Sequence, residues 1–276
     1  MDRKRIEWLF LIIFALIDIY LALEILRSPV SLSNADTNTS SATNIRIEMR
    51  ADGIDLPGKI SHKQQSGYYL AAKNRDYLSG KISSLSQVNA HYSKSNNNLT
   101  ATPKTAVLLN GNSKDILQQI IDFKNDPKNV PYGKKFKYEA SMSGNDSYCF
   151  VQNSNYGAVY DNGAQLLVTV HNKQIDNYTI SYMGPVNSVR EPQLIISAWR
   201  AVSAMYTDRE IGNNSKVMQI KLGYSKLTQV RGNTILLPSW LIWVENKTTK
   251  NITLKRVNAF TAQVLQTNNS YDMGND

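Results

Sequence analysis

The chain has 276 residues, a hydrophobic content of 42% and a formal net charge of +9. This length and composition permit a packed core and leave, beyond a terminal anchor, enough chain for one large domain or two small lobes. Cys149 is the only cysteine, so an intrachain disulfide bond is excluded.

Residues 6–26, IEWLFLIIFALIDIYLALEIL, form the one stretch that is too long and too apolar for a soluble core. At about 1.5 Å per residue, a helix over this range crosses a hydrocarbon layer about 30 Å thick. The basic residues Arg3, Lys4 and Arg5 precede it, and such residues favour the cytoplasmic side. We therefore predict a cytoplasmic N-terminus at residues 1–5, a transmembrane helix at 6–26 and an extracellular remainder, in a single-pass protein of the cell membrane.

A cleaved signal peptide is the alternative to this anchor. Signal peptides carry an apolar region of about 7 to 15 residues, whereas this stretch is longer and contains Glu7, Asp18 and Glu24. Ser33-Asn34-Ala35 offers small residues at a cleavage site. Length and charge favour the uncleaved anchor.

One face of the predicted transmembrane helix combines carboxylates with small side chains. Counting by three and four places Glu7, Leu11, Ala15, Asp18 and Ala22 on this face. In lipid, an ionised Asp18 is costly unless it is paired or protonated, and small residues allow two helices to approach closely. We predict that this face contacts a partner transmembrane helix. The alternative is a protonated or snorkelling Asp18 without a partner.

The chain after the anchor is expected to form a tether, a folded domain and a tail. Residues 27–43 are polar and lack a hydrophobic period, which predicts a flexible linker. Extracellular lobes are expected at residues 44–183 and 184–267, and a disordered tail at 268–276.

The first elements of the domain are predicted from local patterns. Ile45, Ile47 and Met49 alternate with charged residues, which predicts a strand. Further along, Asn112 or Ser113 precedes apolar residues at helical spacing, and Asp126-Pro127 ends the pattern. We expect a short helix between these signals.

Residues 132–187 contain short β-prone segments separated by turn residues, which predict an antiparallel sheet. A second helix is predicted over residues 190–207, with Ser188 and Glu191 at capping-box spacing and Pro192 in the first turn. More β-prone segments follow to residue 264. The predicted fold class is therefore α+β: a single N-terminal transmembrane helix, then a β-rich extracellular domain of antiparallel sheets with packed helices, in two lobes.

Catalytic motifs are lacking in the sequence. It contains no Ser-x-x-Lys, Gly-x-Ser-x-Gly or phosphate-binding glycine loop. The histidines His62, His91 and His171 are not spaced to share a metal ion. We predict no enzyme activity, no cofactor, no metal and no small-molecule substrate.

The basic charge suggests an anionic neighbour of the extracellular domain, such as lipid headgroups, an acidic wall polymer or an acidic protein. Nucleic acid is excluded by the compartment. Lys135 and Lys137 share one face of a predicted strand, which is either an ordinary solvated face or a docking strip. Of Trp240 and Trp243, one is expected in the core and the other under a partner.

Several short motifs then resemble one family. The N-terminal sequence Asp2-Arg3-Lys4-Arg5-Ile6-Glu7-Trp8 precedes an apolar span, and Leu222-Gly223-Tyr224, Leu237-Pro238-Ser239-Trp240 and Val257-Asn258-Ala259-Phe260-Thr261 follow late in the chain. Their order and spacing resemble the YycI (WalI) family. The sequence departs from the expected pattern at Ala262-Gln263, where the closing turn of the last hairpin is expected to carry a glycine.

The resemblance implies a membrane-anchored regulator of the WalK–WalR two-component system of Gram-positive bacteria. Its helix would associate with the transmembrane helices of the sensor histidine kinase WalK, and its extracellular domain would pair with the related membrane protein YycH. Together they would adjust kinase activity and thereby cell-wall metabolism. The resemblance does not imply whether the effect is activation or inhibition.

Two hypotheses remain open at this stage. In the first, the chain is a signalling regulator that works through its helix. In the second, it is an extracellular binding module for anionic wall polymer or lipid headgroups, and the helix is a simple anchor.

Overall fold

The computed structural model describes residues 8, 11–20 and 38–265. The chain divides into two compact units, residues 1–48 and 49–276. In the first unit, residues 8 and 11–20 are helical and exposed. Among the residues that the structure describes, no helix is long and apolar enough to span a membrane. Most of the predicted linker and the whole predicted tail lie outside the described residues.

Residues 45–49 are helical, so the predicted strand at this position is wrong. They belong to helix α2 (Asn38–Ala51), which also takes in the end of the predicted linker. Met49 is fully buried, whereas Ile47 is 60% exposed. Ile45 and Met49 are four residues apart and therefore share one face of a helix. The same apolar pattern thus fits the helical repeat as well as the alternation of a strand.

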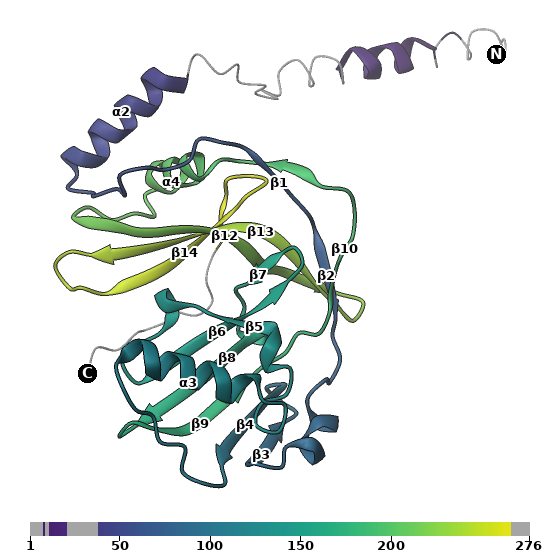
Figure 1. The fold of residues 1–276 in the computed structure, drawn as a ribbon. Helices are drawn as coiled ribbons and strands as arrows, with labels where there is room; N and C mark the ends of the chain where they lie inside the picture. Colours follow the sequence, from purple (N-terminus) through teal and green to yellow (C-terminus); the bar gives the residue numbers. More distant parts are fainter. Residues whose placement is uncertain (1–7, 9–10, 21–37, 266–276) are drawn as a thin grey trace. The chain divides into compact units, whose positions relative to one another are not determined.

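The second unit is β-rich (Figure 1). Only the last residues of α2 belong to it. Its α-helices are α3 (Ser113–Asn125) and α4 (Ala198–Thr207), and its 3-10 helices are η1 (Ser79–Ser84), η2 (Gly133–Lys135), η3 (Ala140–Met142) and η4 (Asn162–Ala164). Its strands are β1 (Gln65–Gly67), β2 (Leu70–Lys73), β3 (Val88–Ser93), β4 (Asn98–Pro103), β5 (Phe136–Tyr138), β6 (Ser147–Ser154), β7 (Gly157–Val159), β8 (Gln165–His171), β9 (Gln174–Ile180), β10 (Val186–Ser188), β11 (Gln193–Ile195), β12 (Ser215–Val230), β13 (Asn233–Asn246), β14 (Ile252–Asn258) and β15 (Val264–Leu265). The predicted α+β class is confirmed for this unit.

One 13-stranded sheet runs through the unit in the order β10-β2-β13-β12-β7-β6-β8-β9-β4-β3, with β14, β15 and β5 paired beside this path. Nearly all of its pairs are antiparallel. The exception is β12 with β7, which meet in parallel at the single register position Tyr224↔Val159. The sheet thus has a β12-side half and a β6-side half joined at a narrow connection. One sheet contains strands from both predicted lobes, residues 44–183 and 184–267. The division into these two lobes stays a prediction.

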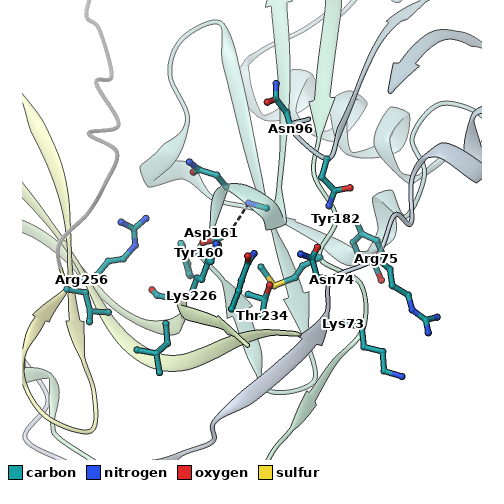
Figure 2. A pocket seen from close by; sticks show the side chains of 18 of the residues that line it. Lys73, Asn74, Arg75, Asn96, Tyr160, Asp161, Tyr182, Lys226, Thr234 and Arg256 are labelled. Atoms are coloured by element: carbon teal, nitrogen blue, oxygen red, sulfur yellow. Dashed lines mark hydrogen bonds between the residues drawn. The ribbon is translucent and has the colours of Figure 1, made fainter. Parts of the chain in front are cut away.

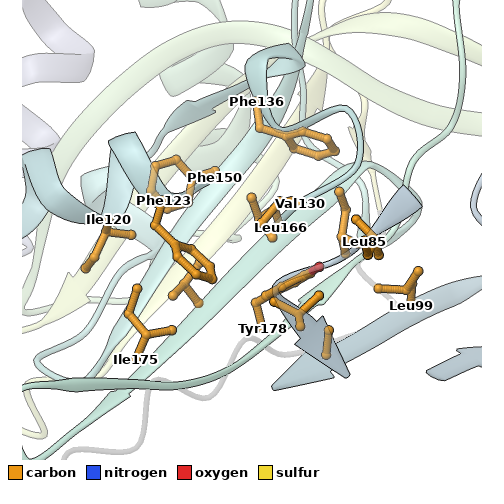
Figure 3. Close-up of a cluster of buried hydrophobic side chains, with 14 of the residues drawn as sticks. Leu85, Leu99, Ile120, Phe123, Val130, Phe136, Phe150, Leu166, Ile175 and Tyr178 are labelled. Carbon is orange, nitrogen blue, oxygen red and sulfur yellow. The ribbon is translucent and has the colours of Figure 1, made fainter. Parts of the chain in front are cut away.

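Helix α3 covers the β6-side half, as Figure 1 shows. It begins as predicted, because the Asn112 side chain accepts hydrogen bonds from the backbone N–H groups of Lys114 and Asp115. Asp115 completes a capping box. The buried face of the helix packs Ile120 and Phe123 into the largest group of core side chains on this half of the sheet (Figure 3).

The predicted helix at 190–207 is shorter than expected, and its predicted start is wrong. Residues Gln193–Ile195 form β11, which pairs with β1, and the helix begins only at Ala198. Its actual cap is Ser197, whose hydroxyl accepts from the backbone N–H of Arg200 at 3.2 Å. Pairing with a strand distant in sequence therefore outweighs the local capping signal at Ser188.

The last hairpin forms without the glycine that its turn is expected to carry. Strands β14 and β15 pair with Val257 opposite Val264. Ala262 occupies the turn with a φ of 65°, and its N–H donates to the carbonyl of Asn258 at 2.9 Å. This left-handed conformation costs an L-residue about 1 to 2 kcal/mol relative to glycine.

We expect Ala262→Gly to stabilise the protein by about 0.5 to 1 kcal/mol, because relief of this strain exceeds the added entropy of the unfolded chain. Chemical denaturation monitored by tryptophan fluorescence measures the change. Ala204→Gly in α4 is the control and should destabilise by about 1 kcal/mol, since it sits in a regular helix. Destabilisation by Ala262→Gly would show that the turn is not strained.

Candidate functional site

A groove of about 620 Å³ opens in the second unit beside the connection between the two halves of the sheet. Four stretches form most of its walls: the end of β2 with the following Asn74 and Arg75, the β3–β4 loop at 95–97, the turn at 160–163, and β12 within 225–229. Residues 182–183 and one residue each of β13, β14 and β15 complete the walls. Figure 2 shows these segments facing the same space. The groove therefore belongs to both halves of the sheet.

The groove is predominantly basic. Lys73, Arg75, Lys226 and Arg256 line it, against the single carboxylate of Asp161. In Figure 2, Arg256 lies toward one end and Lys73 and Arg75 toward the other, with Asp161 between them. An Oδ1 atom of Asp161 accepts from the backbone N–H of Gly163 at 2.9 Å. Positive charge focused in a cleft attracts anionic groups.

Ser225 contributes a buried hydroxyl that lacks a partner. The residue is 3% exposed and lines the groove, and among the described residues its Oγ has no hydrogen-bond partner. A buried polar atom left unsatisfied costs about 1 to 3 kcal/mol, and such atoms are infrequent in folded proteins. A polar group of a ligand would satisfy it.

A buried ion pair lies next to the groove. Glu139 is 3% exposed, and its Oε1 accepts from the Nζ of Lys221 at 2.6 Å. Its Oε2 accepts from the hydroxyl of Tyr160 at 2.6 Å. Lys221 lies on β12 and Tyr160 follows β7, so this cluster ties Glu139 to both strands of the narrow connection. Tyr160 also lines the groove.

The cluster holds Glu139 in its ionised form. Burial alone would raise the pKa of this carboxyl, but the hydrogen bonds from Lys221 and Tyr160 and the charge of Lys221 outweigh it and leave the pKa below the usual value of 4.5. Burial and the hydrogen bond to Glu139 raise the pKa of the Tyr160 hydroxyl. The phenol therefore stays protonated and acts as the hydrogen-bond donor.

Cys149 lies in the same region as a core side chain. It is fully buried on β6, and the Nε2 of Gln165 donates to its Sγ at 3.0 Å. Burial raises the pKa of the thiol to about 12. The unreactive thiol form therefore prevails at neutral pH.

The predicted transmembrane contact face lies only partly in the described residues. Leu11, Ala15 and Asp18 fall in the helical segment 11–20, where all three are exposed, and helical geometry places them on one face. Glu7 and Ala22 lie outside the described residues, as do the topology-setting Arg3, Lys4 and Arg5. The contact face stays a prediction.

The four candidate docking residues separate into two groups. Lys135 and Lys137 are exposed at η2 and β5, while Phe136 between them is buried. Trp240 is 4% exposed and Trp243 is 2% exposed. The Nε1 of Trp240 donates to the carbonyl of Ile196 at 2.9 Å. The chain itself covers both indoles, so neither is available to a docking partner, and the lysines alone remain candidates.

Sequence reasoning missed the groove. Its basic residues come from β2 and the residues after it, from β12 and from β14, and no local motif links them. Only the net charge pointed to an anionic partner. Among the described residues, no group of three or more His, Cys, Asp or Glu side chains is placed to hold a metal ion.

A family model described as YycI protein matches residues 32–260. The chain belongs to the YycI family. This membership indicates a regulator associated with the WalK (YycG) two-component system, because YycI is a regulatory family.

Comparison with solved structures adds two similar chains of low identity. An uncharacterized protein from Eubacterium rectale ATCC 33656 is 11% identical with a TM-score of 0.47, over 78% of this chain and 91% of that one. The C-terminal domain of YpeB from Bacillus megaterium is 13% identical with a TM-score of 0.36, over 83% of this chain and 98% of that one. No curated protein sequence matches the chain.

We expect Glu139→Gln to destabilise this YycI-family protein by about 2 kcal/mol at pH 7, because it leaves the partly buried Lys221 without its counter-ion. Since the folded-state pKa of Glu139 lies below the unfolded value, the ionised form stabilises the fold fully above that value. The stabilisation declines as pH falls from about 4.5 toward the folded-state pKa. The stability gap between wild type and variant should therefore narrow at acid pH.

Urea denaturation from pH 7 to about pH 3 measures both effects. Glu210→Gln is the matched control, because Glu210 pairs with Lys255 at 2.7 Å but its side chain is 40% exposed. Such a pair contributes less than about 1 kcal/mol. Equal losses of unfolding free energy in the two variants would contradict a special role for the Glu139 cluster.

Proposed function

We propose that this YycI-family chain is a membrane-anchored, non-enzymatic regulator that modulates a WalK-like sensor histidine kinase controlling cell-wall metabolism. The observation that carries the proposal is the family match over residues 32–260. The apolar stretch at residues 6–26 supports it, because a regulator of a membrane kinase needs to reside in the same membrane.

In this proposal the N-terminus is cytoplasmic and the folded unit is extracellular. Arg3, Lys4 and Arg5 set this orientation by the positive-inside rule. The face of Glu7, Leu11, Ala15, Asp18 and Ala22 contacts transmembrane helices of the kinase. Within lipid, close packing at Ala15 and Ala22 and a hydrogen bond from a partner to Asp18 would supply the attraction.

The extracellular domain pairs with a YycH-like membrane protein in this proposal. The groove supports a binding role, because four basic side chains and a single carboxylate line it. A regulatory family and a basic groove are consistent with recognition of an anionic partner.

The groove also favours a second candidate function. Its basic residues suit an extracellular module that binds anionic wall polymer or lipid headgroups, with the helix as a simple anchor. Kinase association distinguishes the two candidates. If the second is right, substitutions on the helix face leave kinase association unchanged.

We expect Asp18→Leu, and separately Ala15→Leu with Ala22→Leu, to reduce co-purification of the WalK-like histidine kinase at least fivefold. The first change removes the polar group that a partner would bind, and the second prevents close helix approach. Quantitative immunoblotting of the detergent-solubilised complex measures the association.

The control is Ile13→Phe with Leu16→Phe, because helical geometry places these residues on the opposite face. This pair should leave kinase association unchanged, and all variants should show equal amounts of protein in the membrane fraction. If the Asp18 and alanine variants retain the kinase as well as the control does, the helix is only a tether and the second candidate is favoured.

A further inference from the structure

One edge of β12 is open beside the groove. β12 pairs along its length with β13 on one side. On its other side it pairs with β7 only at Tyr224, and among the described residues no strand pairs with residues 225–230 there. Ser225, Lys226, Leu227 and Gln229 of this segment line the groove. An open strand edge carries backbone donors and acceptors that another strand can use.

The side chains of this segment are also unusually accessible. Leu227 and Val230 are each 48% exposed, although apolar side chains in a strand usually pack against a neighbour. Lys226 is exposed between Ser225 and Leu227. The edge therefore offers hydrogen bonds, apolar contact and positive charge to the same ligand.

The Ser225 hydroxyl in the groove wall is already removed from water in the folded protein. The Ser225 hydroxyl is buried and unpartnered at the beginning of the open edge. Its desolvation is already part of the folded state, so a ligand that bonds to it gains more than it would from an exposed hydroxyl. This is a feature of the site that net charge alone does not explain.

We propose that an extended acidic segment of a partner protein adds as a strand to the β12 edge and lies in the groove. Its backbone would pair with residues 225–230, and its carboxylates would lie beside Lys226 and be attracted by the other basic residues of the groove. Strand addition gives affinity through main-chain hydrogen bonds and specificity through alternate side chains. The proposal deepens the proposed function and rests on it for the existence of an extracellular protein partner.

A polypeptide fits this site better than a phosphate polymer. Both would be attracted by the basic residues, but only a polypeptide supplies N–H and C=O groups at the strand repeat of about 3.3 Å per residue. The open edge spans six positions by number, from 225 to 230, or about 20 Å at that repeat. A partner segment of about eight residues would cover it.

The probe for the test is a fluorescein-labelled peptide of about eight residues that alternates Glu and Val. We expect it to bind the full-length protein in detergent micelles, as measured by fluorescence anisotropy, and to protect from hydrogen exchange those backbone amides of residues 225–230 that point to the open edge. The same peptide with N-methyl groups on alternate residues should bind at least tenfold more weakly, because it cannot complete the ladder. A Lys–Val peptide should not bind.

Two variants connect the binding to the groove. Lys73→Glu with Lys226→Glu should weaken binding at least tenfold, because both charges are reversed. The matched control is Lys114→Glu with Lys128→Glu, which changes exposed lysines that do not line the groove and should have little effect. Ser225→Ala should weaken binding about fivefold without lowering thermal stability, because the hydroxyl has no partner in the free protein.

Four results would overturn the proposal. They are failure of the acidic peptide to bind, equal binding of the N-methylated peptide, binding of poly(glycerol phosphate) in place of the peptide, and peptide binding that occurs only after removal of residues 266–276. The last result would make the chain's own C-terminal segment the occupant. If the peptide fails while the Asp18 variants still lose the kinase, the groove proposal alone is wrong and the proposed function stands.

Discussion

The second unit depends on how the two halves of its sheet are held together at one narrow connection. Backbone pairing there is limited to Tyr224 opposite Val159, so side chains must supply much of the coupling. Glu139 does this by accepting hydrogen bonds from Lys221 on β12 and from Tyr160 after β7. Because a buried carboxylate is stable only when paired and hydrogen-bonded, loss of either donor would loosen both strands together. The width of the groove depends on this cluster, since Tyr160 is part of its wall.

This arrangement separates two tasks along the chain. The N-terminal stretch is suited to contacts within lipid, where small and polar side chains replace the missing hydrophobic drive. The folded unit is suited to recognition, because its groove combines basic side chains, an unpartnered hydroxyl and an open strand edge. A partner bound between the halves of the sheet would make contact with both, so the relative position of the halves would influence its affinity. The proposed function thus assigns this chain two physical inputs, one in the membrane and one outside it.

The elements that could be predicted from sequence are those whose signals are local. Helix α3 followed from Asn112 at its cap and Pro127 beyond its end. The strand predicted at residues 45–49 failed because Ile45 and Met49 fit a helical face as well as an alternating one. The predicted start of α4 was wrong because residues 193–195 form a strand that pairs with β1, which is distant in the sequence. The groove was beyond sequence reasoning, since Lys73, Lys226 and Arg256 meet only when β2, β12 and β14 are assembled in one sheet.

The central claim is that this YycI-family chain changes kinase activity through its transmembrane helix. The most direct measurement is autophosphorylation of the WalK-like histidine kinase in lipid nanodiscs that contain the kinase alone, with the wild-type chain, or with the Asp18→Leu variant. We expect the wild-type chain to change the initial rate of autophosphorylation, in either direction. With the variant, we expect the same rate as in nanodiscs that contain only the kinase. An equal change with wild type and variant would contradict the claim that this helix face carries the regulatory contact.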